Sequence, residues 1–219
     1  SRLTFILSIC LTMFSSGGSL ELCAKSPAPW IELFNGKDLQ GWHNPYPHGE
    51  ARVIDGVIEL VADKKFFLAH DFQFSDFILT GEIKLPPGKA NSGILFRSQK
   101  KENGIMYGYQ AEVDGSDRKW SGGLYDEGRR GWIHPKKPLD NPYNEKHWLE
   151  KQKNAFNRND WNQYKIKCLG DQLKIWVNGI KTTDLKDNAD RKGFIAIQHH
   201  GEKGQIYRFR KLKLKKLLP

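Results

Sequence analysis

The chain is built from short β-rich segments, each closed by glycine, proline, asparagine or aspartate, and these turn signals return about every 8–12 residues. Segments with helical spacing of apolar residues are few, and the best candidate, residues 144–156, is short. Because strands and helices do not alternate along the chain, a parallel sheet covered by helices is excluded. The pattern predicts an all-β fold in which antiparallel strands form a sandwich or jelly roll.

Individual segments indicate where the strands lie. In the stretch "ARVIDGVIEL" we predict a hairpin that turns at Asp55 and Gly56, since an Asp-Gly pair favours a two-residue turn. Further strands are predicted in the segments 76–85, 92–99, 108–113, 161–169, 171–179, 180–185, 193–201 and 204–217.

Length and charge limit the class of protein. The 219 residues fit a single folded domain, to which we assign residues 25–219. The formal net charge of +10 would suit a nucleic-acid partner, because clustered Lys and Arg neutralise phosphates. The lysines are scattered, however, and the densest run, Arg208–Lys216, alternates charged and apolar residues like a strand with one solvated face. No nucleic-acid-binding motif accompanies this run, so we predict no nucleic-acid partner.

Residues 1–24 have the layout of a secretory signal peptide, with Arg2 followed by an apolar run and then small residues. The apolar run is too short to span a bilayer, so we expect no transmembrane segment in the mature chain. The protein is therefore expected to be exported, to a periplasmic or extracellular location. Removing the leader leaves Cys168 without an obvious partner, which argues against a disulfide scaffold and suggests a small core residue.

Strand alternation assigns polar side chains to faces, because neighbours on a strand point to opposite sides of the sheet. In "GYQAEVD" the polar residues Gln110, Glu112 and Asp114 share one face, while the intervening Ala111 and Val113 can face a core. Three polar groups on one face suggest that this side of the strand carries a ligand or water.

The same reasoning separates the two histidines of "GFIAIQHHG". Gln198 and His200 fall on one face, whereas His199 shares the other face with Ile197 and is expected to be structural. By its parity in "SGILFR", Arg97 stands on a strand otherwise suited to burial, where a guanidinium needs a carboxylate or a ligand.

The stretch "WSGGLYDEGRRGW" combines glycines, charges and aromatic residues, a mixture that suits a packed core poorly. We predict that it forms a wall of a polar binding site. The residues in it that could contact a ligand are Trp120, Tyr125, Arg129, Arg130 and Trp132.

The acidic residues of this region have two other interpretations. Asp126 and Glu127 could pair with the neighbouring arginines and make the loop a rigid scaffold. Together with Asp114 and Asp117 they could instead bind a hard cation such as Ca²⁺. Their spacing matches no EF-hand, and we predict neither a metal site nor another cofactor.

Aromatic residues make up 12% of the chain and include seven tryptophans. We expect Trp42, Trp161 and Trp176 to pack in the core. Jelly rolls often curve one sheet into a groove, where polar groups bind sugar hydroxyls and rings pack on sugar C–H faces. A carbohydrate is therefore the expected partner, and nothing in the sequence indicates the oligomeric state.

Several segments together resemble the 3-keto-disaccharide hydrolase domain family, over about Trp30 to Leu217. The most specific are "SGGLYDEGRRGW" and the "QHHG" ending, and "NGKDLQGW" is also distinctive. The resemblance implies a concanavalin-like jelly roll, usually exported, that acts on glycosides oxidised at C3 of the sugar. Much of the family carries Glu and then Gln where this chain has Gln110 and Glu112, so the carboxylate lies one strand step further along the same face.

A ketone at C3 acidifies the C2 hydrogen, so the group on C1 can leave by elimination and water can then add back. This route needs a base near C2, a stabiliser of the enolate oxygen and an acid near the leaving oxygen. We predict proton transfer by His200 with Glu112 or Asp114. The enolate would be held by Arg97 or by an arginine of the loop, while Gln110 and Gln198 would bind the substrate. Direct hydrolysis by paired carboxylates is the alternative mechanism.

Two other classes of function remain open. A carbohydrate-binding module with this fold would hold a sugar without turnover, and it would need no proton-transfer pair. A weaker third possibility is a structural envelope protein whose basic surface holds an anionic polymer.

Overall fold

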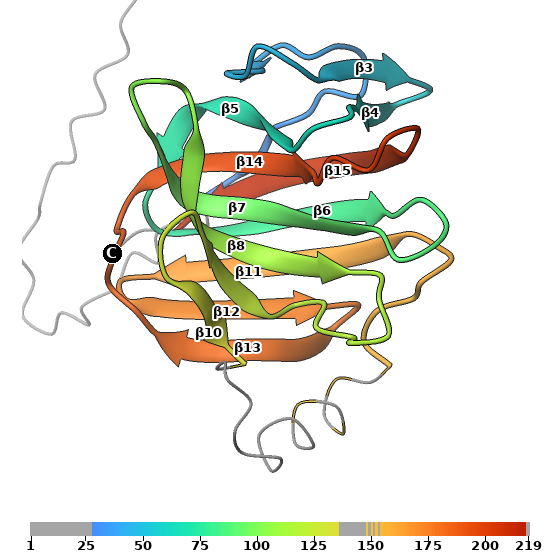
Figure 1. The fold of residues 1–219 in the computed structure, drawn as a ribbon. Helices are drawn as coiled ribbons and strands as arrows, with labels where there is room; N and C mark the ends of the chain where they lie inside the picture. Colours follow the sequence, from blue (N-terminus) through green and yellow to red (C-terminus); the bar gives the residue numbers. More distant parts are fainter. Residues whose placement is uncertain (1–27, 136–147, 149, 151, 153, 218–219) are drawn as a thin grey trace, which may run out of the picture.

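A computed structural model describes residues 28–135, 148, 150, 152 and 154–217. In it two antiparallel sheets pack face to face (Figure 1). The all-β jelly-roll prediction is confirmed. The predicted leader, residues 1–24, lies outside the described residues, as does most of the predicted helix at 144–156, of which Trp148, Glu150 and Gln152 are described and helical.

The first sheet, sheet A, has the strand order β13-β12-β11-β6-β15-β4-β3, and β1 also pairs with β15. Its strands are β1 (Trp30–Glu32), β3 (Glu50–Ile54), β4 (Val57–Val61), β6 (Phe77–Lys84), β11 (Asn162–Leu169), β12 (Gln172–Val177), β13 (Ile180–Lys186) and β15 (Ile206–Lys216).

The second sheet, sheet B, has the order β10-β9-β8-β7-β14-β5-β2. Its strands are β2 (Trp42–His43), β5 (Phe66–Phe74), β7 (Asn91–Lys100), β8 (Met106–Asp114), β9 (Leu124–Glu127), β10 (Gly131–His134) and β14 (Gly193–His199).

Alternating side chains of both sheets fill the space between them. The rings of Phe96 and Tyr109 stack with centroids 5.6 Å apart in this core, and Tyr164 reaches across from sheet A to donate a hydrogen bond to the Glu112 main-chain oxygen at 2.8 Å. Cys168 is fully buried there and forms no disulfide. Burying each large side chain is worth about 1.5–3 kcal/mol, so the alternation provides the main stabilisation of the sandwich.

Local predictions were confirmed where the signal was short-range. The hairpin joining β3 and β4 turns at Asp55 and Gly56, whose φ angles of 49° and 75° are those that a two-residue turn of this kind requires. Within the described part of the chain, no helix is long and apolar enough to cross a membrane.

The prediction that three tryptophans pack in the core was wrong for two of them. Trp42 is buried and donates a hydrogen bond to the Leu33 main-chain oxygen at 2.7 Å. Trp161 and Trp176 lie half-buried on the outer face of sheet A, each beneath a basic side chain. The cause is strand parity, which points both indoles away from the other sheet.

Candidate functional site

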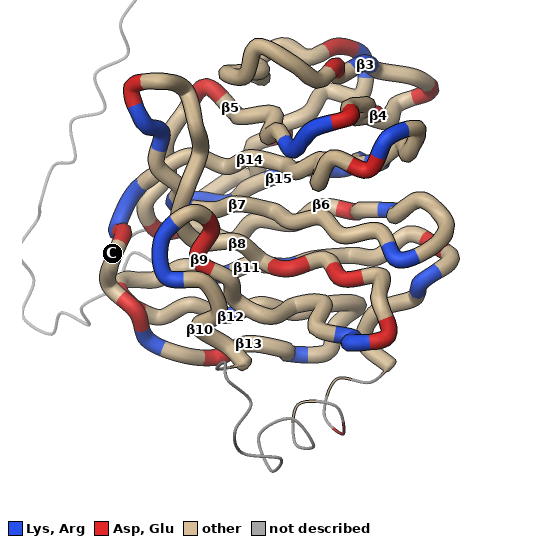
Figure 2. The backbone as a smooth tube through the Cα atoms, viewed as in Figure 1, with Lys and Arg blue, Asp and Glu red and all other residues tan. Residues whose placement is uncertain are grey.

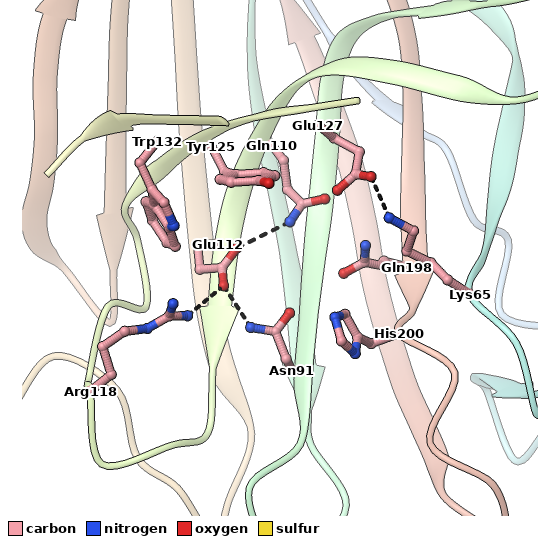
Figure 3. Close-up of a pocket in the computed structure, with 10 residues that line it drawn as sticks. All are labelled: Lys65, Asn91, Gln110, Glu112, Arg118, Tyr125, Glu127, Trp132, Gln198 and His200. Atoms are coloured by element: carbon pink, nitrogen blue, oxygen red, sulfur yellow. Dashed lines mark hydrogen bonds and ion pairs between the residues drawn. The ribbon is translucent and has the colours of Figure 1, made fainter. Parts of the chain in front are cut away.

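A polar pocket of about 210 Å³ opens on the outer face of sheet B. Neighbouring strands β14, β7, β8, β9 and β10 supply most of its wall, and one lysine comes from the turn before β5. In Figure 3, Glu112, Arg118 and Trp132 lie on one side, and Lys65, Gln198 and His200 lie on the other. The lining residues are Lys65, Asn91, Gln110, Glu112, Arg118, Tyr125, Glu127, Trp132, Gln198 and His200.

Glu112 is the most buried charge in this pocket, with 3% of its surface exposed. Its Oε1 accepts hydrogen bonds from Asn91 at 2.6 Å and from Arg118 at 3.1 Å, and its Oε2 accepts one from Gln110 at 3.1 Å (Figure 3). Burial raises the pKa of Glu112 to about 7, against the opposing effects of the Asn91 hydrogen bond and the Arg118 charge. A carboxyl with this pKa exchanges a proton near neutral pH.

Asp114 was predicted to be catalytic, but the structure gives it a different position. It does not line this pocket, and its Oδ2 accepts a hydrogen bond from Arg118 Nε at 2.8 Å. Burial alone would raise the pKa of Asp114, but hydrogen bonds from Ser116 and Arg118 outweigh it and hold the pKa below the ordinary value. Asp114 therefore fixes the guanidinium and keeps its own charge. Figure 2 shows the two acidic positions of β8 on a strand that carries no other charge.

Arg118 is held on several sides. Besides its two carboxylate partners, its guanidinium carbon lies 4.6 Å from the ring centroid of Trp120 and 4.8 Å from that of Trp132. The two indoles meet edge to face, with centroids 4.6 Å apart. Trp120 is buried, so it supports the site from behind, whereas Trp132 lines the pocket. A planar cation stacked in this way is pre-organised to bind an oxyanion or a carbonyl.

Two buried amide oxygens of the pocket lining have no hydrogen-bond partner among the described residues. They are Oε1 of Gln110 and Oε1 of Gln198, both on residues that line the pocket and are at least 98% buried. The Gln110 amide is oriented by its donation to Glu112. Gly93 provides the room for Gln110, because a Cβ at position 93 would overlap its side chain. Buried acceptors that lack a donor are sites where ligand hydroxyls can bind.

The two histidines are separated as their parity predicted. His200 lines the pocket with 48% of its side chain exposed, and its Nδ1 lies 2.9 Å from Glu202 Oε1. His199 is fully buried and packs on Phe66 and Tyr207. The predicted placement of His200 and Gln198 on the face of Glu112 is confirmed.

The loop between Trp120 and Trp132 borders the pocket, as predicted, but its arginines do not line it. Tyr125, Glu127 and Trp132 face the pocket. Arg129 and Arg130 both pair with buried Asp126 and extend to Asp190 and Asp187, in the connection before β14. Their predicted contact with a ligand of this pocket is corrected. Their pairing with Asp126 agrees with the scaffold interpretation, whereas Glu127 contacts Lys65 instead. The contacts to Asp190 and Asp187 attach the β9–β10 hairpin to a distant segment, which the sequence did not predict.

Arg97 was also predicted to bind the substrate, and the structure places it outside the pocket. An extra residue in β7 shifts its register with both β8 and β14 between Leu95 and Gln99, and Arg97 has a φ of 46°. This bulge reverses the parity on which the prediction depended. The fully buried guanidinium donates to Ser75 and Gly170 main-chain oxygens and to Asp76 Oδ1, at 2.6–2.7 Å.

The four carboxylates considered as calcium ligands do not converge. Asp117 is exposed beside Lys89, and Glu127 contacts Lys65. Asp114 pairs with Arg118, and Asp126 pairs with Arg129. In the part of the chain that the structure describes, no group of three or more His, Cys, Asp or Glu side chains is arranged to hold a metal.

Four residues that line the pocket were not among the predicted site residues, namely Lys65, Asn91, Arg118 and Glu127. Glu127 had been considered only as an ion-pair partner or a cation ligand. Lys65 and Arg118 lie in turns, where alternation gives no direction. Asn91 could have been found, because it has the same parity as Gly93 and lies opposite Asp114 on β8, from where its side chain reaches Glu112. The strand was predicted to begin one residue later.

The family model that matches the chain describes a 3-keto-alpha-glucoside-1,2-lyase-like domain and spans residues 29–215. No curated protein matches the chain.

Solved structures with similar folds include a protein of Parabacteroides distasonis proposed to be a glycosyl hydrolase. It is 17% identical, with 86% of this chain and 94% of that chain covered and a TM-score of 0.59. The carbohydrate-binding module CBM66 from Bacillus subtilis is 18% identical, with coverages of 80% and 96% and a TM-score of 0.59. The lumenal domain of VIP36, bound to Ca²⁺ and Man3GlcNAc, is 9% identical, with coverages of 86% and 88% and a TM-score of 0.55. At these identities the similarity shows the fold alone.

Proposed function

The chain belongs to the 3-keto-alpha-glucoside-1,2-lyase-like domain family, and from this we propose that it cleaves 3-keto-glycosides in the pocket around Glu112. The observation that carries the proposal is the Glu112 carboxyl, which is buried in a polar pocket and has a pKa raised to about 7. A general base works best when its pKa lies near the working pH. The pocket volume of about 210 Å³ is below the range of about 300–1,000 Å³ typical of drug-sized ligands. A single sugar ring is the substrate portion that fits.

In the proposed reaction Glu112 takes the proton from C2 of the sugar, and the C–H electron pair forms a C2–C3 double bond with the negative charge on the C3 oxygen. The C1–oxygen bond then breaks as the carbonyl re-forms, and the leaving oxygen takes a proton from His200. Water adds to C1 of the resulting enone and a proton returns to C2, so the net change is hydrolysis. His200 suits the acid role because it lies at the pocket rim and Glu202 engages its Nδ1, which leaves Nε2 for the leaving oxygen.

Arg118 is the proposed stabiliser of the enolate oxygen, in place of the arginines suggested by the sequence. It lies beside Glu112 and is fixed by Asp114 and two indole rings. A positive charge that needs no reorganisation stabilises developing negative charge most effectively. Asp114 is accordingly a positioning residue.

The unpartnered oxygens of Gln110 and Gln198 are proposed to accept hydrogen bonds from two sugar hydroxyls. A site that is built to bind hydroxyls rejects analogues lacking them, because its own buried polar atoms then remain unpaired. This arrangement favours a polyhydroxylated ring over an apolar ligand of the same size.

A carbohydrate-binding module is the second candidate, and one observation favours it. Both oxygens of Glu112 already accept hydrogen bonds from the protein, an arrangement that also suits a carboxylate that only orients a sugar. Such a module would bind without releasing the group on C1.

The deciding experiment incubates the protein with a 3-keto-glucoside bearing a chromogenic aglycone, and with its unoxidised parent, in D₂O. We expect release of the aglycone from the keto sugar alone, with enzyme-dependent deuterium at C2 of recovered substrate or product. Glu112→Gln should lose both, and Glu102→Gln, the same change at an exposed loop position, should lose neither. Release without C2 labelling would favour direct hydrolysis, and binding without release would favour the binding module.

A further inference from the structure

The outer face of sheet A, on the opposite side of the sandwich from the pocket, carries a regular group of lysines. Lys165 of β11 aligns with Thr80 of β6, which aligns with Lys213 of β15. Two residues further along the strands, Lys167 and Lys215 align in the same way on either side of Ile78 of β6. Sheet spacings place the Cα atoms of these four lysines at the corners of a rectangle of roughly 7 Å by 10 Å.

These four lysines, which we call the lysine quartet, have no carboxylate partner among the described residues. Two of the nearby acids serve other cations, since Glu82 pairs with Arg210 and Lys211, and Asp184 pairs with Lys174 and Lys181. A third, Glu32, aligns with Lys213 across β1 and β15 but forms no ion pair with it. Four like charges on one face repel one another, and a bound polyanion would relieve this repulsion. The arrangement is therefore complementary to a partner with several negative charges.

Three indole rings lie on the same face and are interleaved with its cations. Lys165 Nζ lies 4.7 Å from the ring centroid of Trp176, and Lys213 Nζ lies 5.2 Å from that of Trp30. The third ring, Trp161, lies 3.9 Å from the guanidinium carbon of Arg210. Trp30 is 42% exposed and the other two are half-buried. Simple phosphate or sulfate ions would need only the cations, whereas the C–H faces of sugar rings also pack on indoles.

We propose that the outer face of sheet A binds a linear anionic polysaccharide, whose carboxylate or sulfate groups contact the lysine quartet while its rings pack on the neighbouring indoles. The choice of a sugar polymer over other polyanions rests on the proposed function, which makes the chain a protein that acts on glycosides. A flat sheet face also lacks the projecting element that reads bases in a nucleic-acid groove. The polymer would hold the protein near its glycoside substrates without occupying the pocket.

The test measures binding to alginate, a linear polymer of uronates, with full-length protein at low and at physiological salt. Replacing the whole lysine quartet by glutamine should weaken binding by about tenfold or more and flatten its salt dependence. A matched control replaces four exposed lysines elsewhere, Lys37, Lys64, Lys101 and Lys203, and lowers the net charge equally. The control should change affinity by less than about twofold, because only contacting charges are lost.

A second variant separates sugar binding from general attraction to polyanions. Trp176→Leu should weaken binding to alginate while leaving the weak, salt-sensitive attraction to duplex DNA unchanged. Equal weakening by the quartet and control variants would overturn the proposal, as would binding to DNA or to phosphatidylglycerol vesicles as tight as to alginate. Glu112→Gln should keep its affinity for alginate, and the quartet variant should keep its turnover of a 3-keto-glucoside. Failure of this proposal and failure of the proposed function can thus be told apart.

Discussion

Replacing Glu112 with glutamine should change how the stability of the protein depends on pH. The pKa of this carboxyl rises from an ordinary 4.5 to about 7 on folding, so the folded protein holds the Glu112 proton more tightly than the unfolded chain does. Between pH 4.5 and 7 the folded state then binds more protons, and the free energy of unfolding falls as the pH rises. The loss is complete above about pH 7 and amounts to about 3 kcal/mol, since one pKa unit corresponds to about 1.4 kcal/mol.

The assay is urea denaturation of the wild type and of Glu112→Gln at intervals between pH 4.5 and 8.5. Glutamine does not titrate, so the stability of the variant relative to the wild type should rise by about 3 kcal/mol across this range. Burial lowers the pKa of His70 and His199, so the folded protein loses stability as the pH falls and these two imidazoles take up protons. They are present in both proteins and cancel in the difference. A difference that stays constant with pH would refute the raised pKa, and with it the main support for Glu112 as a base.

Three further outcomes are expected. His200→Ala should lower kcat on a 3-keto-glucoside by about 10²–10⁴-fold with an unchanged thermal midpoint, and a change in KM alone would assign His200 to binding. Gly93→Ala should displace Gln110 from the pocket and weaken sugar affinity, and it should destabilise the protein by about 1–3 kcal/mol. Titration with sugar measures the affinity and urea denaturation measures the stability. Unchanged affinity would contradict the role given to Gln110. Arg97→Ala should destabilise the protein by about 3–5 kcal/mol, because Asp76 and two main-chain oxygens lose their buried donor. A decrease in the free energy of unfolding below about 1 kcal/mol would contradict this account.

The sequence predicted which side chains share a face wherever the strands are regular. Gln110 and Glu112 lie on β8, and Gln198 and His200 lie on and just after β14, with β7 in between. All four line one pocket, as their alternation required. Alternation is a local property of an extended backbone, so it can be followed without knowing the strand neighbours. The fold class and the β3–β4 hairpin depend on signals of the same short range.

The tertiary structure decided which parts of the chain meet, and it changed every arginine assignment. Arg97 was misplaced because one inserted residue in β7 reverses parity, and a bulge of this kind has no strong sequence signal. Arg129 and Arg130 were misplaced because, besides Asp126 in their own hairpin, they bind Asp190 and Asp187 about 60 residues away, in the connection that precedes β14. Arg118 and the pKa of Glu112 were not foreseen because burial and loop position result from packing the two sheets together. The sequence by itself thus determined the faces of the strands, while the convergence of loops and the electrostatics of the pocket are properties of the folded sandwich.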